Sequence, residues 1–177
     1  MRFLTGTLTL VLTVCTAPPV VARPPARPSQ APRPAPVAEG ALGWAGFADE
    51  GIIPHTLAGA SWRGYVTRYI SGGPELQFMT GPGTDRDLLL TGNVMVDILA
   101  PTTDRPGRTT PFVALGGGLF LNSQGVGSES YSSSEGAFTA GVGVREWTTD
   151  RVFIAVDARI GWEPHVRLAA VVGVALR

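Results

Sequence analysis

The chain has 177 residues, and its 14 arginines balance 14 acidic residues without any lysine. That length suits one folded domain rather than two, and the absence of a positive excess gives no indication of nucleic-acid binding. Charged residues make up only 16% of the chain, whereas the surface of a soluble domain is typically ~25–35% charged. We therefore expect part of the surface to face something other than water.

The first 22 residues have the pattern of a signal peptide. Met1 and Arg2 precede an apolar run, and small residues follow up to Ala22. The run is about twelve residues long, too short for the ~20 residues that a membrane-spanning helix needs. Cys15 is the single cysteine, which excludes an intrachain disulfide, and we expect it to be removed with the signal. Residues 23–38 are rich in proline and are predicted to form a disordered, extended tether.

From residue 39 to residue 177, apolar and polar residues alternate with a period of two, which predicts an all-β domain. A loop rich in serine and glycine is expected over 123–134. An even number of strands of about ten residues suits a closed antiparallel up-and-down transmembrane barrel, because every backbone group in lipid must be paired. Eight strands are predicted, over residues 41–49, 55–67, 74–81, 86–100, 110–122, 135–148, 151–163 and 165–177.

The alternation separates two faces in the later strands. Small residues such as Gly141 and Gly143 accompany the charges, and small residues suit a crowded lumen better than a soluble surface. An arginine that faces lipid at the membrane midplane costs ~2–4 kcal/mol, which also favours charges inside. A soluble barrel with the reverse arrangement is the alternative. The predicted lumen-facing charges are Glu75, Asp97, Arg145, Asp157, Arg159, Glu163 and Arg167. The predicted lipid-facing residues are Leu88, Leu90, Val94, Val96, Val142, Val144, Ile154, Val156, Ile160, Val172 and Val174.

Aromatic residues near the predicted strand ends give a further expectation. Phe112, Phe120, Trp147 and Trp162 fit the aromatic girdles that membrane barrels place at both lipid interfaces. Ordinary packing in the core is the alternative for each of them.

Four segments carry a family resemblance: GPELQFMTGPGTDRDLLLTGNVMVD, PFVALGGGLF, GAFTAGVGVREW and RIGWEPHVRLAAVVGVAL. Together they resemble the outer-membrane protein β-barrel domain family, the small OmpA-like eight-stranded barrels of Gram-negative bacteria. The resemblance covers about residues 39–177 and implies a monomer with both chain ends in the periplasm. It implies outer-membrane lipid and the outer-membrane insertion machinery as partners, and a structural, adhesive or narrow-pore (porin-like) role.

Motifs for chemistry are few. His55 and His165 each open a predicted strand, and neither belongs to a metal-binding spacing such as HExxH. No GxSxG sequence is present, and no GK[ST] follows the glycines at 116–118, which suit sheet curvature or close strand approach. We therefore predict no catalytic residue, cofactor or metal site. Two other functions stay open: an exported soluble barrel that binds an apolar ligand, and a lipid-modifying outer-membrane enzyme.

Overall fold

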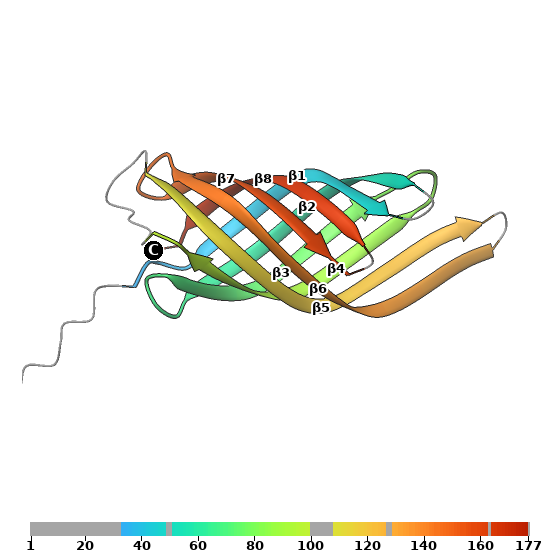
Figure 1. Cartoon of the computed structure of the whole chain (residues 1–177), viewed down its shortest axis with the longest axis horizontal. Helices are drawn as coiled ribbons and strands as arrows, with labels where there is room; N and C mark the ends of the chain where they lie inside the picture. Colours follow the sequence, from blue (N-terminus) through green and yellow to red (C-terminus); the bar gives the residue numbers. More distant parts are fainter. Residues whose placement is uncertain (1–32, 49–50, 100–107, 127–128, 163, 177) are drawn as a thin grey trace, which may run out of the picture. The chain divides into compact units, whose positions relative to one another are not determined.

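The predicted closed antiparallel barrel of eight strands is confirmed. The computed structural model describes residues 33–48, 51–99, 108–126, 129–162 and 164–176 (Figure 1). Each strand pairs with the next, and β8 pairs with β1 to close the barrel. The described residues contain no helix of the length and apolarity needed to cross a membrane. The strands are β1 (Val37–Ala48), β2 (Ile52–Tyr65), β3 (Ile70–Thr80), β4 (Arg86–Asp97), β5 (Thr109–Val126), β6 (Glu129–Trp147), β7 (Val152–Gly161) and β8 (His165–Ala175).

The predicted loop over 123–134 is wrong, because β5 and β6 continue through most of it. Their register extends to the pair Val126 and Glu129. The pairing of β4 with β5 stops at Ser123, and the pairing of β6 with β7 stops at Thr139. The tip of the hairpin is therefore a two-stranded ribbon that extends past the other strands (Figure 1). Serine and glycine suggested a loop by composition, but they are compatible with strands where a partner strand pairs every backbone group.

The barrel has two distinct ends. At the terminal end, β1 begins and β8 ends; at the hairpin end, β5 and β6 turn. The connections from β1 to β2, from β3 to β4 and from β7 to β8 also lie at the hairpin end, because all neighbouring strands are antiparallel. The positions of the charged network and of the two histidines can be given relative to these two ends.

Alternation along the strands separates a polar interior from an apolar exterior. In β8, the inward residues from His165 to Ala175 are buried, and the residues between them are exposed. Ten of the eleven residues predicted to face lipid lie on the outer face with exposed fractions of 38–60%. The eleventh, Leu88, is half-buried on that face. Because side chains in a strand point alternately to opposite sides, register alone decides this sorting.

The predicted aromatic girdle is wrong for three of its four residues. Phe112, Phe120 and Trp147 point inward and are each 2% exposed, whereas Trp162 is 53% exposed on the outside. The parity of the strand explains the difference, because Trp147 lies two residues from the inward Arg145 and shares its face. Other aromatic side chains are exposed on the outer face, namely Trp44, Trp62, Phe78 and Phe138.

The triple glycine of β5 permits a close approach to β4. A Cβ atom on Gly118 would lie 1.9 Å from the carbonyl oxygen of Leu90, whereas on Gly117 its nearest neighbour would be 3.8 Å away. We expect Gly118→Ala to lower the free energy of unfolding by about 1–3 kcal/mol, the usual cost of overpacking. The matched Gly117→Ala variant should be nearly neutral. Urea unfolding in detergent micelles measures both, and equal stabilities would contradict the close approach.

Candidate functional site

An aromatic and charged cluster fills the lumen at the terminal end. Arg145 on β6 forms an ion pair with Asp97 on β4 at 3.2 Å. The hydroxyl of Tyr65 lies 3.4 Å from the Asp97 carboxylate, and Arg145 donates to the same hydroxyl at 3.3 Å. The Arg145 guanidinium also lies 4.8 Å from the ring centre of Phe153 and 5.1 Å from that of Phe112. Such contacts stabilise a buried cation through the negative faces of the rings.

Glu39 and Arg63 form a second ion pair that joins β1 to β2. Arg63 also donates to the hydroxyl of Ser71 at 3.3 Å, and Ser61 donates to Glu39 at 2.7 Å. Sequence reasoning missed this pair. The signal was present, since Arg63 and Tyr65 share one face while Trp62 lies on the other, but the pattern was less regular here than in the later strands.

The middle of the lumen holds the densest part of the network. Arg159 on β7 contacts Asp157 at 2.6 Å and Glu75 at 3.2 Å. Arg167 on β8 reaches Glu75 on β3 at 2.6 Å, which links strands on opposite sides of the barrel. Asn93 accepts from Arg159 at 3.0 Å and donates to Glu75 at 3.1 Å. Each guanidinium here has more than one partner, as a buried charge requires.

Six of the seven charges predicted for the lumen point inward and are buried, and Glu163 lies outside the described residues. The structure brings these six together in two groups, one around Asp97 and one around Glu75. A cavity of about 20 Å³ borders the Glu75 group, which is room for about one water molecule. With Glu39 and Arg63 included, the network consists of four carboxylates paired to four guanidiniums: Glu39, Glu75, Asp97, Asp157, Arg63, Arg145, Arg159 and Arg167.

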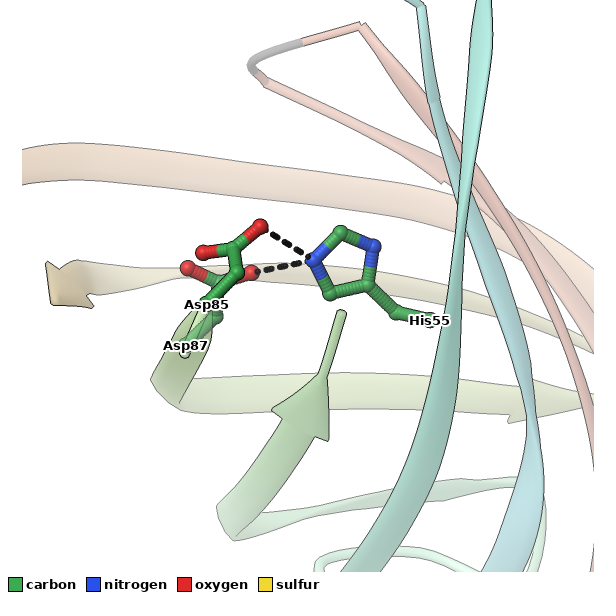
Figure 2. A group of neighbouring side chains, drawn as sticks. All are labelled: His55, Asp85 and Asp87. Carbon is green, nitrogen blue, oxygen red and sulfur yellow. Dashed lines mark hydrogen bonds and ion pairs between the residues drawn. The ribbon is translucent and has the colours of Figure 1, made fainter. Parts of the chain in front are cut away.

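A separate cluster lies at the hairpin end (Figure 2). Figure 2 shows the Asp85 and Asp87 carboxylates pointing toward one ring nitrogen of His55. His55 Nε2 is 2.9 Å from Asp85 Oδ2 and 3.2 Å from Asp87 Oδ2. Asn122 donates to the other oxygen of each carboxylate, at 3.2 Å to Asp85 Oδ1 and 2.7 Å to Asp87 Oδ1. We call these four residues the mouth cluster.

The mouth cluster lines a cavity of about 360 Å³. Phe47 forms part of the cavity wall and packs against both His55 and His165, with ring centres 4.7 and 5.0 Å apart. Sequence reasoning missed the cluster because its members are far apart in the chain. The signal that could have found it is the strand order, since an antiparallel meander places the start of β2 and the start of β4 at the same barrel end.

An apolar layer separates the mouth cluster from the charged network. Leu57 and Leu89 are the next inward residues after His55 on β2 and after Asp87 on β4, and Met79 on β3 pairs with Leu57; all three are fully buried. The hydrogen-bond partners of His55 are the Asp85 carboxylate and the Ile53 carbonyl, and neither is a serine hydroxyl. That set of partners differs from the Ser–His pair of a serine hydrolase.

Scans of family models and of curated proteins find no match to the chain. Solved structures do match. The N-terminal β-barrel domain of OprF from Pseudomonas aeruginosa is 14% identical, with a TM-score of 0.65 over 81% of this chain and 98% of that one. Neisserial surface protein A is 12% identical, with a TM-score of 0.65 over 80% and 96%. Ail from Yersinia pestis is 9% identical, with a TM-score of 0.56 over 81% and 98%. The chain thus has the fold of the small eight-stranded outer-membrane barrels.

Proposed function

We propose that the chain is a non-enzymatic outer-membrane barrel of a Gram-negative envelope, exported by its N-terminal signal, with a structural and adhesive role. The observation that carries the proposal is the sorting of side chains, with charges inside and leucine, isoleucine and valine outside on the same strands. In water, so many exposed apolar side chains would be an aggregation liability, whereas in lipid they are in their preferred medium. A soluble barrel that binds an apolar ligand requires the opposite sorting.

A packed lumen supports a structural role over a porin-like one. The five ion pairs of the network occupy the interior, and the rings of Phe112, Trp147 and Phe153 fill its terminal end. A barrel of eight strands is just wide enough for its own side chains. We therefore expect no steady ion conductance through this barrel.

The β5–β6 hairpin supports an adhesive role. Its ribbon continues beyond Ser123 and Thr139, where neither β4 nor β7 pairs with it. An exposed strand edge can add a strand from a partner through main-chain hydrogen bonds. Tyr131 on this edge is 63% exposed, and such an aromatic side chain is typical of binding surfaces.

Fractionation of cells that express the full chain tests the location. We expect the protein in the outer-membrane fraction, extractable by detergent, with a compact form that migrates differently on a denaturing gel before and after heating. Reconstituted in planar bilayers, it should show no conductance steps, with a large porin as the positive control. A protein that stays in the aqueous fraction after osmotic shock would exclude the membrane location, and regular conductance steps would exclude the closed lumen.

A shortened hairpin tests the adhesive part separately. Replacing residues 123–132 with a two-residue Asn-Gly turn should keep the heat-dependent gel shift, because Asn122 and Ser133 then flank the turn and the barrel retains its register. Attachment of the cells to surfaces or to other cells should fall to the level of cells without the protein. Unchanged attachment by the shortened variant would remove the adhesive role and leave the structural one.

A further inference from the structure

We propose that His55, Asp85 and Asp87 bind a divalent transition-metal ion, best suited to Zn²⁺, at the hairpin end of the barrel. The three residues each offer one ligand atom, and these atoms lie within 4.8 Å of one another. Zinc bonds to imidazole nitrogen and carboxylate oxygen are about 2.0–2.2 Å long, so neighbouring ligands in a tetrahedron are about 3.3 Å apart. The observed separations of 2.9 and 3.2 Å between His55 Nε2 and the two carboxylates are close to that spacing.

The tautomer of His55 favours metal binding. Its Nδ1 lies 3.2 Å from the carbonyl oxygen of Ile53, and a carbonyl oxygen can only accept. In the neutral tautomer with the proton on Nδ1, His55 donates to this carbonyl and turns the Nε2 lone pair toward two carboxylate oxygens. That arrangement is repulsive unless a cation lies between the three atoms. A backbone carbonyl that orients the ring in this way is the usual partner of a metal-binding histidine.

Charge balance gives an independent reason for a cation. The network in the lumen pairs four carboxylates with four guanidiniums, whereas the mouth cluster has two carboxylates and one imidazole. Within the described residues, no arginine forms an ion pair with Asp85 or Asp87. The side chains of His55 and Asp87 are each 2% exposed, so water does little to compensate the excess negative charge. A divalent cation with neutral His55 makes the cluster neutral.

Asn122 orients the carboxylates for this role. It donates to the Oδ1 atom of each aspartate, at 3.2 and 2.7 Å, which leaves both Oδ2 atoms directed at His55. Metal-binding carboxylates are commonly held by such hydrogen bonds. The adjoining cavity of about 360 Å³ gives the ion a free position for water or for an anionic group. Because one ligand is an imidazole nitrogen, the set suits Zn²⁺ better than Ca²⁺ or Mg²⁺, which prefer oxygen ligands.

Titration of the chelator-treated full chain in detergent with Zn²⁺, followed by calorimetry, tests the proposal. We expect one Zn²⁺ per chain and no displacement by excess Ca²⁺. Loss of a group that only orients a metal ligand costs about 10–100-fold in affinity, so His55→Gln and Asp87→Asn, which remove direct ligands, should each weaken binding at least that much. Glu135→Gln is the matched control, because Glu135 is an exposed carboxylate near the same barrel end and outside the cluster.

The heat-dependent gel shift reports whether each variant folds. If His55→Gln or Asp87→Asn does not fold, Asp85→Asn carries the test, because Asp85 lies in the connection between β3 and β4 and not in a strand. A wild-type chain that binds no Zn²⁺, or variants that bind it as tightly as the Glu135→Gln control, would overturn the proposal. In that case the contacts of His55 with the two aspartates describe the cluster without a metal ion. The site requires only the folded barrel, so this result is independent of the outer-membrane location.

Discussion

Replacing Val156 with arginine is expected to block assembly of the barrel. Val156 is 56% exposed on the outer face, in the middle of β7. An arginine facing lipid at the membrane midplane costs about 2–4 kcal/mol, a large share of the stability of a small domain. Refolding into lipid vesicles, followed by the heat-dependent gel shift, measures the folded fraction, and we expect it to fall severalfold or more.

Two control variants separate lipid exposure from a general effect of substitution. Ile52→Arg places the same charge on the outer face at the start of β2, where Ile52 is 71% exposed. Near the interface this cost falls to about 0–1 kcal/mol, so Ile52→Arg should assemble. Arg159→Gln should also be milder than Val156→Arg, because the glutamine amide can still donate to Asp157 and Glu75 keeps its pairing with Arg167. If Arg159→Gln blocked assembly while Val156→Arg did not, the faces of the barrel would be inverted.

The ion pair of Arg145 with Asp97 should show strong coupling between its members. Arg145→Met leaves the Asp97 carboxylate, less than 2% exposed, without its cation. Removing one partner of a buried pair costs about 3–5 kcal/mol, whereas replacing both with apolar residues is often neutral. We therefore expect Arg145→Met to lower the free energy of unfolding by about that amount, and added Asp97→Leu to restore most of it.

Urea unfolding in micelles, followed by tryptophan fluorescence, completes this double-mutant cycle, with Trp147 as a nearby reporter. The single variant Asp97→Leu is needed as well, because it leaves the guanidinium unpaired instead. If the two single costs simply added in the double variant, the 3.2 Å contact between Arg145 and Asp97 would have little energetic meaning.

The alternation of apolar and polar residues along each strand was sufficient to predict the barrel and its two faces. Val156 and Arg159 were assigned to opposite faces by parity alone, which is enough because a strand has only two faces. The same rule placed Trp147 with Arg145, yet the preference of aromatic residues for lipid interfaces suggested a girdle position. Trp147 instead packs inside the barrel against Phe153, with ring centres 4.9 Å apart. Interiors of small barrels need bulky side chains as much as interfaces do.

Contacts between distant strands could not be predicted in the same way. Arg167 meets Glu75 across the lumen, and which carboxylate it reaches depends on strand tilt and on side-chain length rather than on sequence spacing. The mouth cluster is a sharper example, since His55 and Asp85 are separated by a full hairpin. The hairpin ribbon was missed for another reason. Its serines have a weak intrinsic preference for strands, and only the long register of β5 with β6 overrides it.

The apolar residues Leu57, Met79 and Leu89 are expected to close the cavity at the hairpin end toward the charged network. These side chains are fully buried and lie on β2, β3 and β4 between His55 and the arginines of the charged network. We therefore expect a solute in that cavity to exchange with the hairpin side only. In an intact membrane, a chelator that does not cross the bilayer should have complete access to His55 from the hairpin side and none from the side of the chain termini. We expect the barrel to be sided in its solvent contacts, with the cavity accessible from the hairpin side alone.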